Sequence, residues 1–281
     1  MTPVRREAVV DESVRLEVLP LGSSEEQAAR LPEPVRLTIT CSPKHGPDRS
    51  VEVAARMRGM GHSVTVHLAA RMVRDRDHLE TLLGRIADAA IDDLFVVGGD
   101  TPRPVGPYAS AAELLPLIGD RGGPSPRIGI AGYPEGHPLI DERELDDALE
   151  RKCDRADYIS TQLCLDPDAL RGWIRRTRSR GIDLPVFMGI PGQLSRRRLV
   201  EMSVRVGVGP SLSFLRKQRG LRRLLGRSAA DRLYDALAPS LGDPDLNIAG
   251  FQCFTFNELA GTWEWLEQKR GARPPAEAIG R

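Results

Sequence analysis

Two acidic residues of this chain stand where catalytic chemistry could take place. Glu17 lies between apolar neighbours in the run LEVLP, and Asp100 follows two glycines in VVGGD. A carboxyl group among apolar side chains loses hydration, so its pKa rises and it suits general-acid catalysis near neutral pH. The glycines before Asp100 let a flat ligand approach the backbone, with Asp100 as its hydrogen-bond acceptor. Simpler interpretations stay open: a solvated strand-edge residue for Glu17 and a turn residue for Asp100.

Other polar residues also follow apolar runs, and two of them resemble metal ligands. Glu135 and His137 lie two positions apart, but no third ligand at a suitable spacing is evident, so we predict no metal site. The sequence contains neither G-x-G-x-x-G nor G-x-x-x-x-G-K-[ST], so any dinucleotide has to be held by loops of another kind. The polar residues that close apolar runs are Thr40, His67, Tyr133, Glu135, His137 and Gln162.

Eight strand-like runs alternate with helical segments and would position these residues. Several runs are almost continuously apolar, such as LFVV and PVFMG, as expected when helices cover one face of a parallel sheet. Eight strand–helix pairs in 281 residues predict a closed (β/α)8 TIM barrel, with a doubly wound open sheet as the rival. Active sites of such barrels lie where the strands end, so the polar residues would converge there. The predicted strands are Val14–Leu19, Val35–Cys41, Ser63–Leu68, Leu94–Val97, Arg127–Ala131, Tyr158–Thr161, Pro185–Gly189 and Ile248–Phe254.

The helical segments carry their own start and stop signals. One helix is predicted after Pro167 and Asp168 and before Gly181. Its apolar stripe follows helical spacing and would lie on the barrel. Ser23 and Glu26 predict a capping box on a short first helix. The stripe consists of Leu170, Trp173, Ile174 and Thr177.

We expect one catalytic domain over residues 13–270, with flexible residues 1–12 before it and a disordered tail over 271–281. A mostly helical insertion is predicted between Gly207 and Asp245, before the last strand. It contains the basic run FLRKQRGLRRLLGR. A solvated helix face is the favoured interpretation of this run, and binding of phosphates or a polyglutamate tail is the alternative.

Composition excludes several classes of protein. Forty Lys and Arg against 39 Asp and Glu leave a formal charge of +1, which gives no electrostatic reason for nucleic-acid or membrane binding. The four cysteines form no C-x-x-C pair, which suits a reducing compartment. No apolar run approaches the ~20 residues that span a bilayer, and the first residues lack the apolar stretch of a secretory signal. We therefore expect a cytoplasmic protein.

Taken together and in order, the motifs resemble one enzyme family. LEVLP, LTIT, HSVTVHL, FVVGGDTP, AGYPEGHP, ERKCDRADYISTQLCLD, FMGIPG and FQCFTFNEL are similar to the methylenetetrahydrofolate reductases. The resemblance runs from about Val14 to Leu266. It implies a TIM barrel with FAD across its mouth, NADH or NADPH as reductant, a small-molecule folate as substrate, and a place in one-carbon metabolism and methionine biosynthesis. A homo-oligomer is an open possibility.

The resemblance also implies roles for individual residues. Glu17 matches the family's catalytic acid, Asp100 the aspartate placed between pterin and flavin, and Gln162 the glutamine that binds the pterin. The remaining matches are cofactor contacts. The positions that match FAD-binding residues are Thr40, His67, Gly99, Asp100, Tyr108, Tyr133, Arg151 and Lys152.

The sequence departs from the family pattern at four positions. Gly98 replaces an arginine, Leu145 an aspartate, Ala148 an asparagine, and Glu258 an arginine that follows the last strand. Three alternatives therefore stay open: a flavin-independent NADH-linked reductase, catabolic oxidation of methyltetrahydrofolate after a demethylase, and a non-catalytic folate- or flavin-binding barrel. The joint presence of Glu17, Asp100 and Gln162 favours an enzyme, because a binding protein has less need of the acid.

Overall fold

The computed structural model describes residues 13–119, 125–195, 197–199, 201 and 228–271. The predicted flexible segment 1–12, the basic run and nearly all of the predicted tail lie outside these residues. The described part of the predicted insertion is helical, consisting of α9 (Ala229–Leu237) and the 3-10 helix η3 (Ala238–Gly242).

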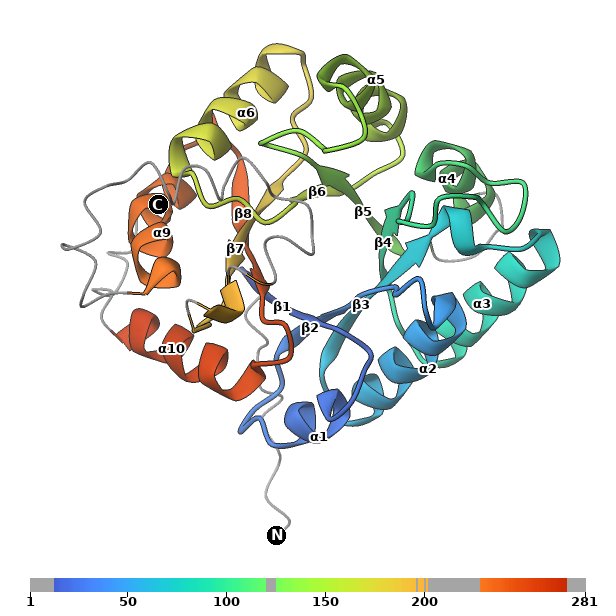
Figure 1. The fold of residues 1–281 in the computed structure, drawn as a ribbon, viewed down its shortest axis with the longest axis horizontal. Helices are drawn as coiled ribbons and strands as arrows, with labels where there is room; N and C mark the ends of the chain where they lie inside the picture. The colour runs from blue at the N-terminus through green and yellow to red at the C-terminus, as the bar shows by residue number, and fades with distance from the viewer. Residues whose placement is uncertain (1–12, 120–124, 196, 200, 202–227, 272–281) are drawn as a thin grey trace, which may run out of the picture.

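Eight parallel strands form a closed barrel in the order β1 to β8, and β8 pairs with β1 to close it. Figure 1 shows the ring of strands with the helices around it. The predicted TIM barrel is confirmed, and the open-sheet rival is excluded because an open sheet has no pairing between its first and last strands. The strands are β1 Val14–Val18, β2 Arg36–Ile39, β3 Ser63–Ala69, β4 Asp93–Val97, β5 Arg127–Gly132, β6 Tyr158–Thr161, β7 Val186–Pro191 and β8 Ile248–Phe254.

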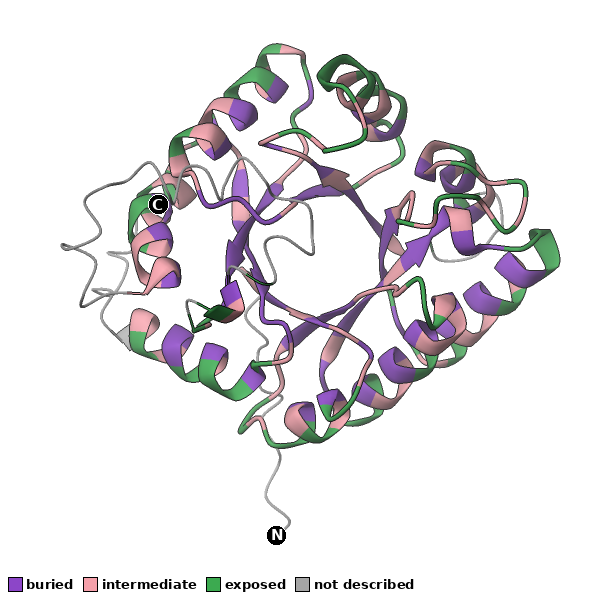
Figure 2. Ribbon diagram, viewed as in Figure 1, coloured by how far each residue is buried: buried purple, intermediate pink, exposed green. Residues whose placement is uncertain are grey.

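The helices pack their apolar stripes on the outside of the barrel, and their outer faces are exposed (Figure 2). In α6 the predicted stripe Leu170, Trp173, Ile174 and Thr177 is buried. The helices are α1 Ser24–Ala29, α2 Gly46–Gly59, the 3-10 helix η1 Ala70–Met72, α3 Arg76–Asp88, α4 Ala111–Gly119, α5 Glu142–Cys153, α6 Pro167–Ser179, α9 and α10 Leu259–Gly271. No described helix is long and apolar enough to cross a membrane.

One predicted helix cap is wrong. Ser23 precedes α1 but accepts no hydrogen bond from the helix backbone, and its Oγ accepts instead from Nε2 of Gln27 at 3.2 Å. The capping box needs an extended residue at the cap, and Ser23 has ψ 18°. The structure has that box at α9, where Ser228 has ψ 164° and exchanges hydrogen bonds with Asp231.

Charged side chains fill the barrel interior at the N-terminal ends of the strands. Asp93 accepts a hydrogen bond from the Tyr158 hydroxyl at 2.7 Å and forms ion pairs with Arg15 at 3.2 Å and Arg36 at 3.1 Å. The Arg15 guanidinium also lies 4.0 Å from the ring centroid of Phe187. We call Arg15, Arg36, Asp93 and Tyr158 the barrel floor. All four residues are buried, so the floor is closed and the opposite, C-terminal end carries the mouth.

Candidate active site

Strand alternation aims Glu17 into the barrel mouth. Successive side chains of a strand point to opposite faces, and Arg15, two residues earlier, points inward to the floor. By the same alternation Thr40 follows the inward-facing Arg36 and Thr38 of β2, and His67 follows the inward-facing Thr65 of β3. Three predicted site residues from neighbouring strands are thus brought together above the floor.

The Glu17 carboxyl group is partly buried and hydrogen-bonded to a residue of β8. Nε2 of Gln252 donates to its Oε2 at 3.4 Å, and the Gln252 Oε1 accepts from the Thr38 hydroxyl at 3.4 Å. Desolvation by burial raises the pKa of Glu17 to about 8, although the hydrogen bond from Gln252 lowers it. The group is therefore mostly protonated at neutral pH. This supports the general-acid interpretation over a solvated residue at a strand edge.

Three buried polar atoms at the mouth have no hydrogen-bond partner within the described part of the chain: Oγ1 of Thr40, Nε2 of His67 and Oγ1 of Thr101. Burial lowers the pKa of His67 to about 3, so its ring is neutral, and it packs 4.7 Å from the Phe95 ring. Buried polar atoms in native proteins almost always have partners. His67 lies in β3, Thr40 directly follows β2, and Thr101 lies in the loop after β4, so the three come from neighbouring strands of the barrel and indicate a place for a ligand with hydrogen-bonding groups.

Asp100 lies exposed in the loop after β4, beside the end of β5. Burial raises the pKa of Tyr133 to about 12, and the charge of Asp100 contributes to that rise, so the two side chains lie within electrostatic reach. Gly99 has φ 94°, and a Cβ there would stand 3.0 Å from the Cβ of Ala69. The loop thus needs glycine at this point because of its positive φ and the close approach of Ala69.

Gln162 directly follows β6 and offers a free donor group at the mouth. Its backbone N–H donates to the Gly132 carbonyl at 2.8 Å, and its side-chain Oε1 accepts from the N–H of Leu163 at 2.8 Å. The Nε2 group has no partner among the described residues. An amide in this position can donate to a ring nitrogen or oxygen of a ligand.

Glu135 and His137 have structural contacts in the loop after β5. Nδ1 of His137 accepts from the N–H of Leu139 at 3.2 Å, and the His137 ring packs edge-on against Tyr133 at 5.5 Å. Burial raises the pKa of the Cys164 thiol above its usual range, and the charge of Glu135 raises it further. Among the described residues, no three or more His, Cys, Asp or Glu side chains are grouped as metal ligands would be.

Comparison with known proteins assigns the family. A sequence model of the family described as methylenetetrahydrofolate reductase matches residues 25–206, more than half of the chain. The chain belongs to the methylenetetrahydrofolate reductase family. This confirms the resemblance carried by the motifs.

Named relatives support the same assignment. The chain is 33% identical over 109 residues to methylenetetrahydrofolate reductase 2 of Saccharomyces cerevisiae, covering 35% of this chain and 18% of that protein. It is 33% identical over 165 residues to methylenetetrahydrofolate reductase (NADH) 1 of Zea mays, covering 51% and 27%. A protein named probable methylenetetrahydrofolate reductase (NADPH) from Caenorhabditis elegans is 33% identical over 98 residues, covering 33% and 15%. The chain thus spans less than a third of the length of these relatives.

Two residues matched to the family's cofactor contacts lie apart from the mouth. Arg151 and Lys152 occupy the last turn of α5, which starts near the mouth and runs back along the barrel for roughly 15 Å. Burial, together with the charge of Arg151, lowers the pKa of Lys152 to about 8. No contact within the described residues joins either side chain to Glu17, His67 or Asp100.

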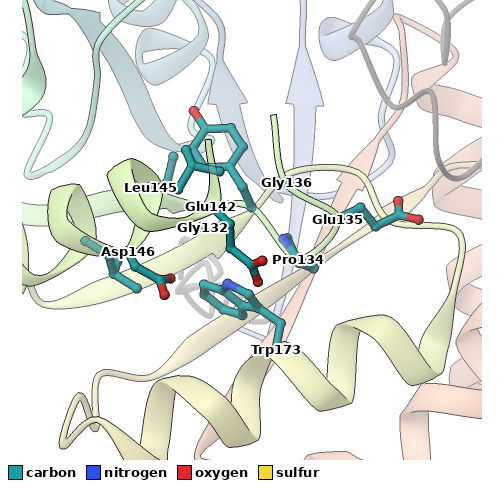
Figure 3. Close-up of a pocket in the computed structure, with 11 residues that line it drawn as sticks. Gly132, Pro134, Glu135, Gly136, Glu142, Leu145, Asp146 and Trp173 are labelled. Atoms are coloured by element: carbon teal, nitrogen blue, oxygen red, sulfur yellow. The ribbon is translucent and has the colours of Figure 1, made fainter. Parts of the chain in front are cut away.

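A pocket of about 290 Å³ lies beside the mouth, between the end of β5, α5 and α6. Figure 3 shows the carboxyl groups of Glu142 and Asp146 toward the Trp173 indole, with Glu135 pointing away. Leu145, where the resemblance implies an aspartate, lines this pocket. At this position the lining is apolar, beside the carboxyl groups of Glu142 and Asp146.

The sequence interpretation missed four residues that support the site: Thr38, Gln252, Thr101, and Arg71, whose guanidinium group hydrogen-bonds to the loop that carries Asp100. Gln252 contacts Glu17 across 235 positions of sequence. A glutamine within the apolar run FQCFTF was the available signal, because a polar residue at an inward position of a buried strand needs a partner. For Thr101 and Arg71 the sequence held no comparable signal.

Proposed function

We propose that this chain is a methylenetetrahydrofolate reductase. It would interconvert 5,10-methylenetetrahydrofolate and 5-methyltetrahydrofolate, with NADH or NADPH as reductant and FAD as bound cofactor. The observation that carries the proposal is the Glu17 carboxyl group, which is aimed into the mouth of a barrel of this family and accepts a hydrogen bond from Gln252, while burial raises its pKa to about 8. Relatives named for NADH and for NADPH support a nicotinamide reductant.

Glu17 supplies the proton that the folate substrate needs. When the five-membered ring of the substrate opens, a carbon–nitrogen bond breaks and the nitrogen takes up a proton. A partly buried carboxyl group that is still protonated at neutral pH can donate that proton, and the carboxylate left behind keeps the hydrogen bond from Gln252. Gln162 can donate to the pterin through its unpaired amide group.

The mouth fits a flat cofactor with hydrogen-bonding edges. The unpartnered atoms of Thr40, His67 and Thr101 would bind it. Bound FAD would carry a hydride between the nicotinamide and the folate. The protein's own contribution is to hold the rings in register, keep water from the reacting atoms and provide the acid.

FAD binding is predicted to be weak, because Gly98, Leu145 and Ala148 lack the polar side chains that the family uses. We expect dilution or gel filtration to strip FAD from the protein and added FAD to restore folate turnover. The measurement is turnover before and after filtration, with the flavin absorbance followed in the same samples. A protein that keeps stoichiometric FAD through extensive filtration would contradict the prediction.

A second candidate is a flavin-independent reductase in which NADH reduces the folate directly. The apolar surface of Leu145 in the pocket beside α5 favours it, because the nucleotide half of FAD loses a polar partner there. The visible absorption spectrum of the purified protein separates the two. Flavin peaks support the first candidate, and a colourless protein that is fully active and indifferent to added FAD supports the second.

Asp100→Asn should lower folate turnover by roughly 10²-fold, about 2.7 kcal/mol of barrier. The substitution keeps the shape of the side chain and removes the charge that acts on neighbouring groups at the mouth. Steady-state kinetics measure it, with Asp88→Asn on the exposed end of α3 as the matched control. Unchanged kinetics in Asp100→Asn would leave Asp100 as a turn residue only.

A further inference from the structure

Arg71 forms several hydrogen bonds to the loop that carries Asp100. It lies in η1, directly after β3, and its guanidinium donates three hydrogen bonds to backbone carbonyls of the β4–α4 loop. Nε donates to Thr101 at 2.8 Å, Nη2 to Pro102 at 2.7 Å and Nη1 to Ala109 at 3.3 Å. Arg71 forms no ion pair with any carboxylate of the described residues. All three guanidinium nitrogens therefore donate to this one loop.

The Arg71 backbone holds the same loop at two further points. Its N–H donates to the Gly98 carbonyl at 2.9 Å, and its carbonyl accepts from the N–H of Val105 at 2.9 Å. The loop also touches the chain just after Arg71, since a Cβ at Gly106 would stand 2.1 Å from the Arg74 carbonyl oxygen. The contacts extend from Gly98 to Ala109 and enclose both Asp100 and Tyr108.

The sequence of this loop explains why an arginine is needed. The segment GGDTPRPVGPYAS contains three prolines, which have no N–H, and forms neither helix nor strand. Its carbonyls therefore lack the usual backbone donors. A guanidinium presents several donors in a fixed plane and can satisfy carbonyls on both sides of a turn, whereas an ammonium group is a single flexible point.

We propose that Arg71 is a positioning residue that fixes the β4–α4 loop and thereby sets Asp100 at the barrel mouth. Gly98, at the end of β4, has no side chain that could hold the loop. An arginine from the end of β3 stabilises the loop instead, by bonding to its backbone. The restraint on the loop follows from these contacts alone, whereas its effect on folate turnover rests on the proposed function.

Hydrogen–deuterium exchange of the intact protein tests the positioning directly. In Arg71→Met, we expect the amides of residues 98–109 to exchange at least ~10-fold faster than in the parent, because local opening loses its main restraint. Arg71→Lys should fall between the two, and added guanidinium should partly restore protection in Arg71→Met. Arg74→Met is the control, since among the described residues the exposed Arg74 side chain forms only an ion pair to Asp48 at 3.7 Å. Unchanged exchange of this loop in Arg71→Met would overturn the proposal.

A double-mutant cycle tests the link to Asp100. If Arg71 acts through Asp100, Arg71→Met lowers kcat, and combining it with Asp100→Asn costs little beyond the single Asp100→Asn change. Fully additive losses would mean that Arg71 acts on the substrate by itself and would overturn the positioning role. A parent protein without folate turnover would refute the proposed function, and the exchange experiment would still decide whether Arg71 fixes the loop.

Discussion

Glu17→Gln should lower folate reduction by ~10²–10⁴-fold, the usual effect of losing a general acid. Oxidation of the nicotinamide with an artificial electron acceptor should stay within a few-fold of the parent. The two half-reactions differ because opening of the folate ring needs a proton from the protein, whereas oxidation of the nicotinamide needs none from a carboxylic acid. Stopped-flow measurement of each half-reaction gives the comparison, or overall turnover if no flavin is bound.

The pH dependence provides a second check on the same residue. Glu17 acts in its protonated form, so folate turnover of the parent should fall as the pH rises through about 8, the pKa that burial gives this group. Glu17→Gln should lose this alkaline limb, because glutamine does not titrate. Equal losses in both half-reactions would indicate a structural role for Glu17, and no loss in either would remove it from the mechanism.

The strands could be predicted closely because the apolar runs of a parallel barrel are short and sharply bounded. Tyr158–Thr161 and Ile248–Phe254 agree residue for residue with β6 and β8. β7 extends to Pro191, two residues beyond the prediction, because it continues to pair with β8 up to Phe254. Proline cannot donate a hydrogen bond to the neighbouring strand, and at the end of a strand this loss is tolerated.

The parts of the site that depend on register could not be predicted. Strand-end positions alone placed Glu17, Thr40, His67 and Gln162 at one mouth. The hydrogen bond from Gln252 needs the pairing of β1 with β8, which aligns Arg15 with Gln252 and Glu17 with Phe254. That pairing is a property of barrel closure, and no local pattern in the sequence encodes it.

The contacts of Arg71 could be predicted even less from the sequence. They are made to backbone carbonyls, which every residue has, so side-chain types in the loop carry no sign of them. Tyr108 was matched as a cofactor contact, yet its position depends on the same loop. The structure therefore links two predicted site residues through a third that motif comparison does not mark.

Asp93→Ala should destabilise the protein by about 3–5 kcal/mol, because it removes the carboxylate that the floor arginines share. Arg15 and Arg36 are both buried, and each forms an ion pair with Asp93 at 3.2 and 3.1 Å. Without Asp93 the buried Arg15 guanidinium loses its ion pair, and Arg36 loses the ion pair that it makes with the same carboxylate. The Tyr158 hydroxyl loses its acceptor as well. Urea unfolding measures the change in the free energy of unfolding. In thermal unfolding, the expected fall in Tm is roughly 6–12 °C.

Asp92→Ala is the matched control, because Asp92 is the exposed neighbour of Asp93 and its side chain has no described contact. Its effect should stay within about 0.5 kcal/mol. Replacing Arg15 by methionine in the Asp93→Ala background should recover part of the lost stability, since the charge that has lost its ion pair is removed as well. Equal stability of Asp93→Ala and Asp92→Ala would contradict the argument and would mean that the floor arginines are neutralised by another group. Recovery in this double variant would show that the cost of losing Asp93 comes from the buried charge of Arg15 and not from the cavity left by the Asp93 side chain.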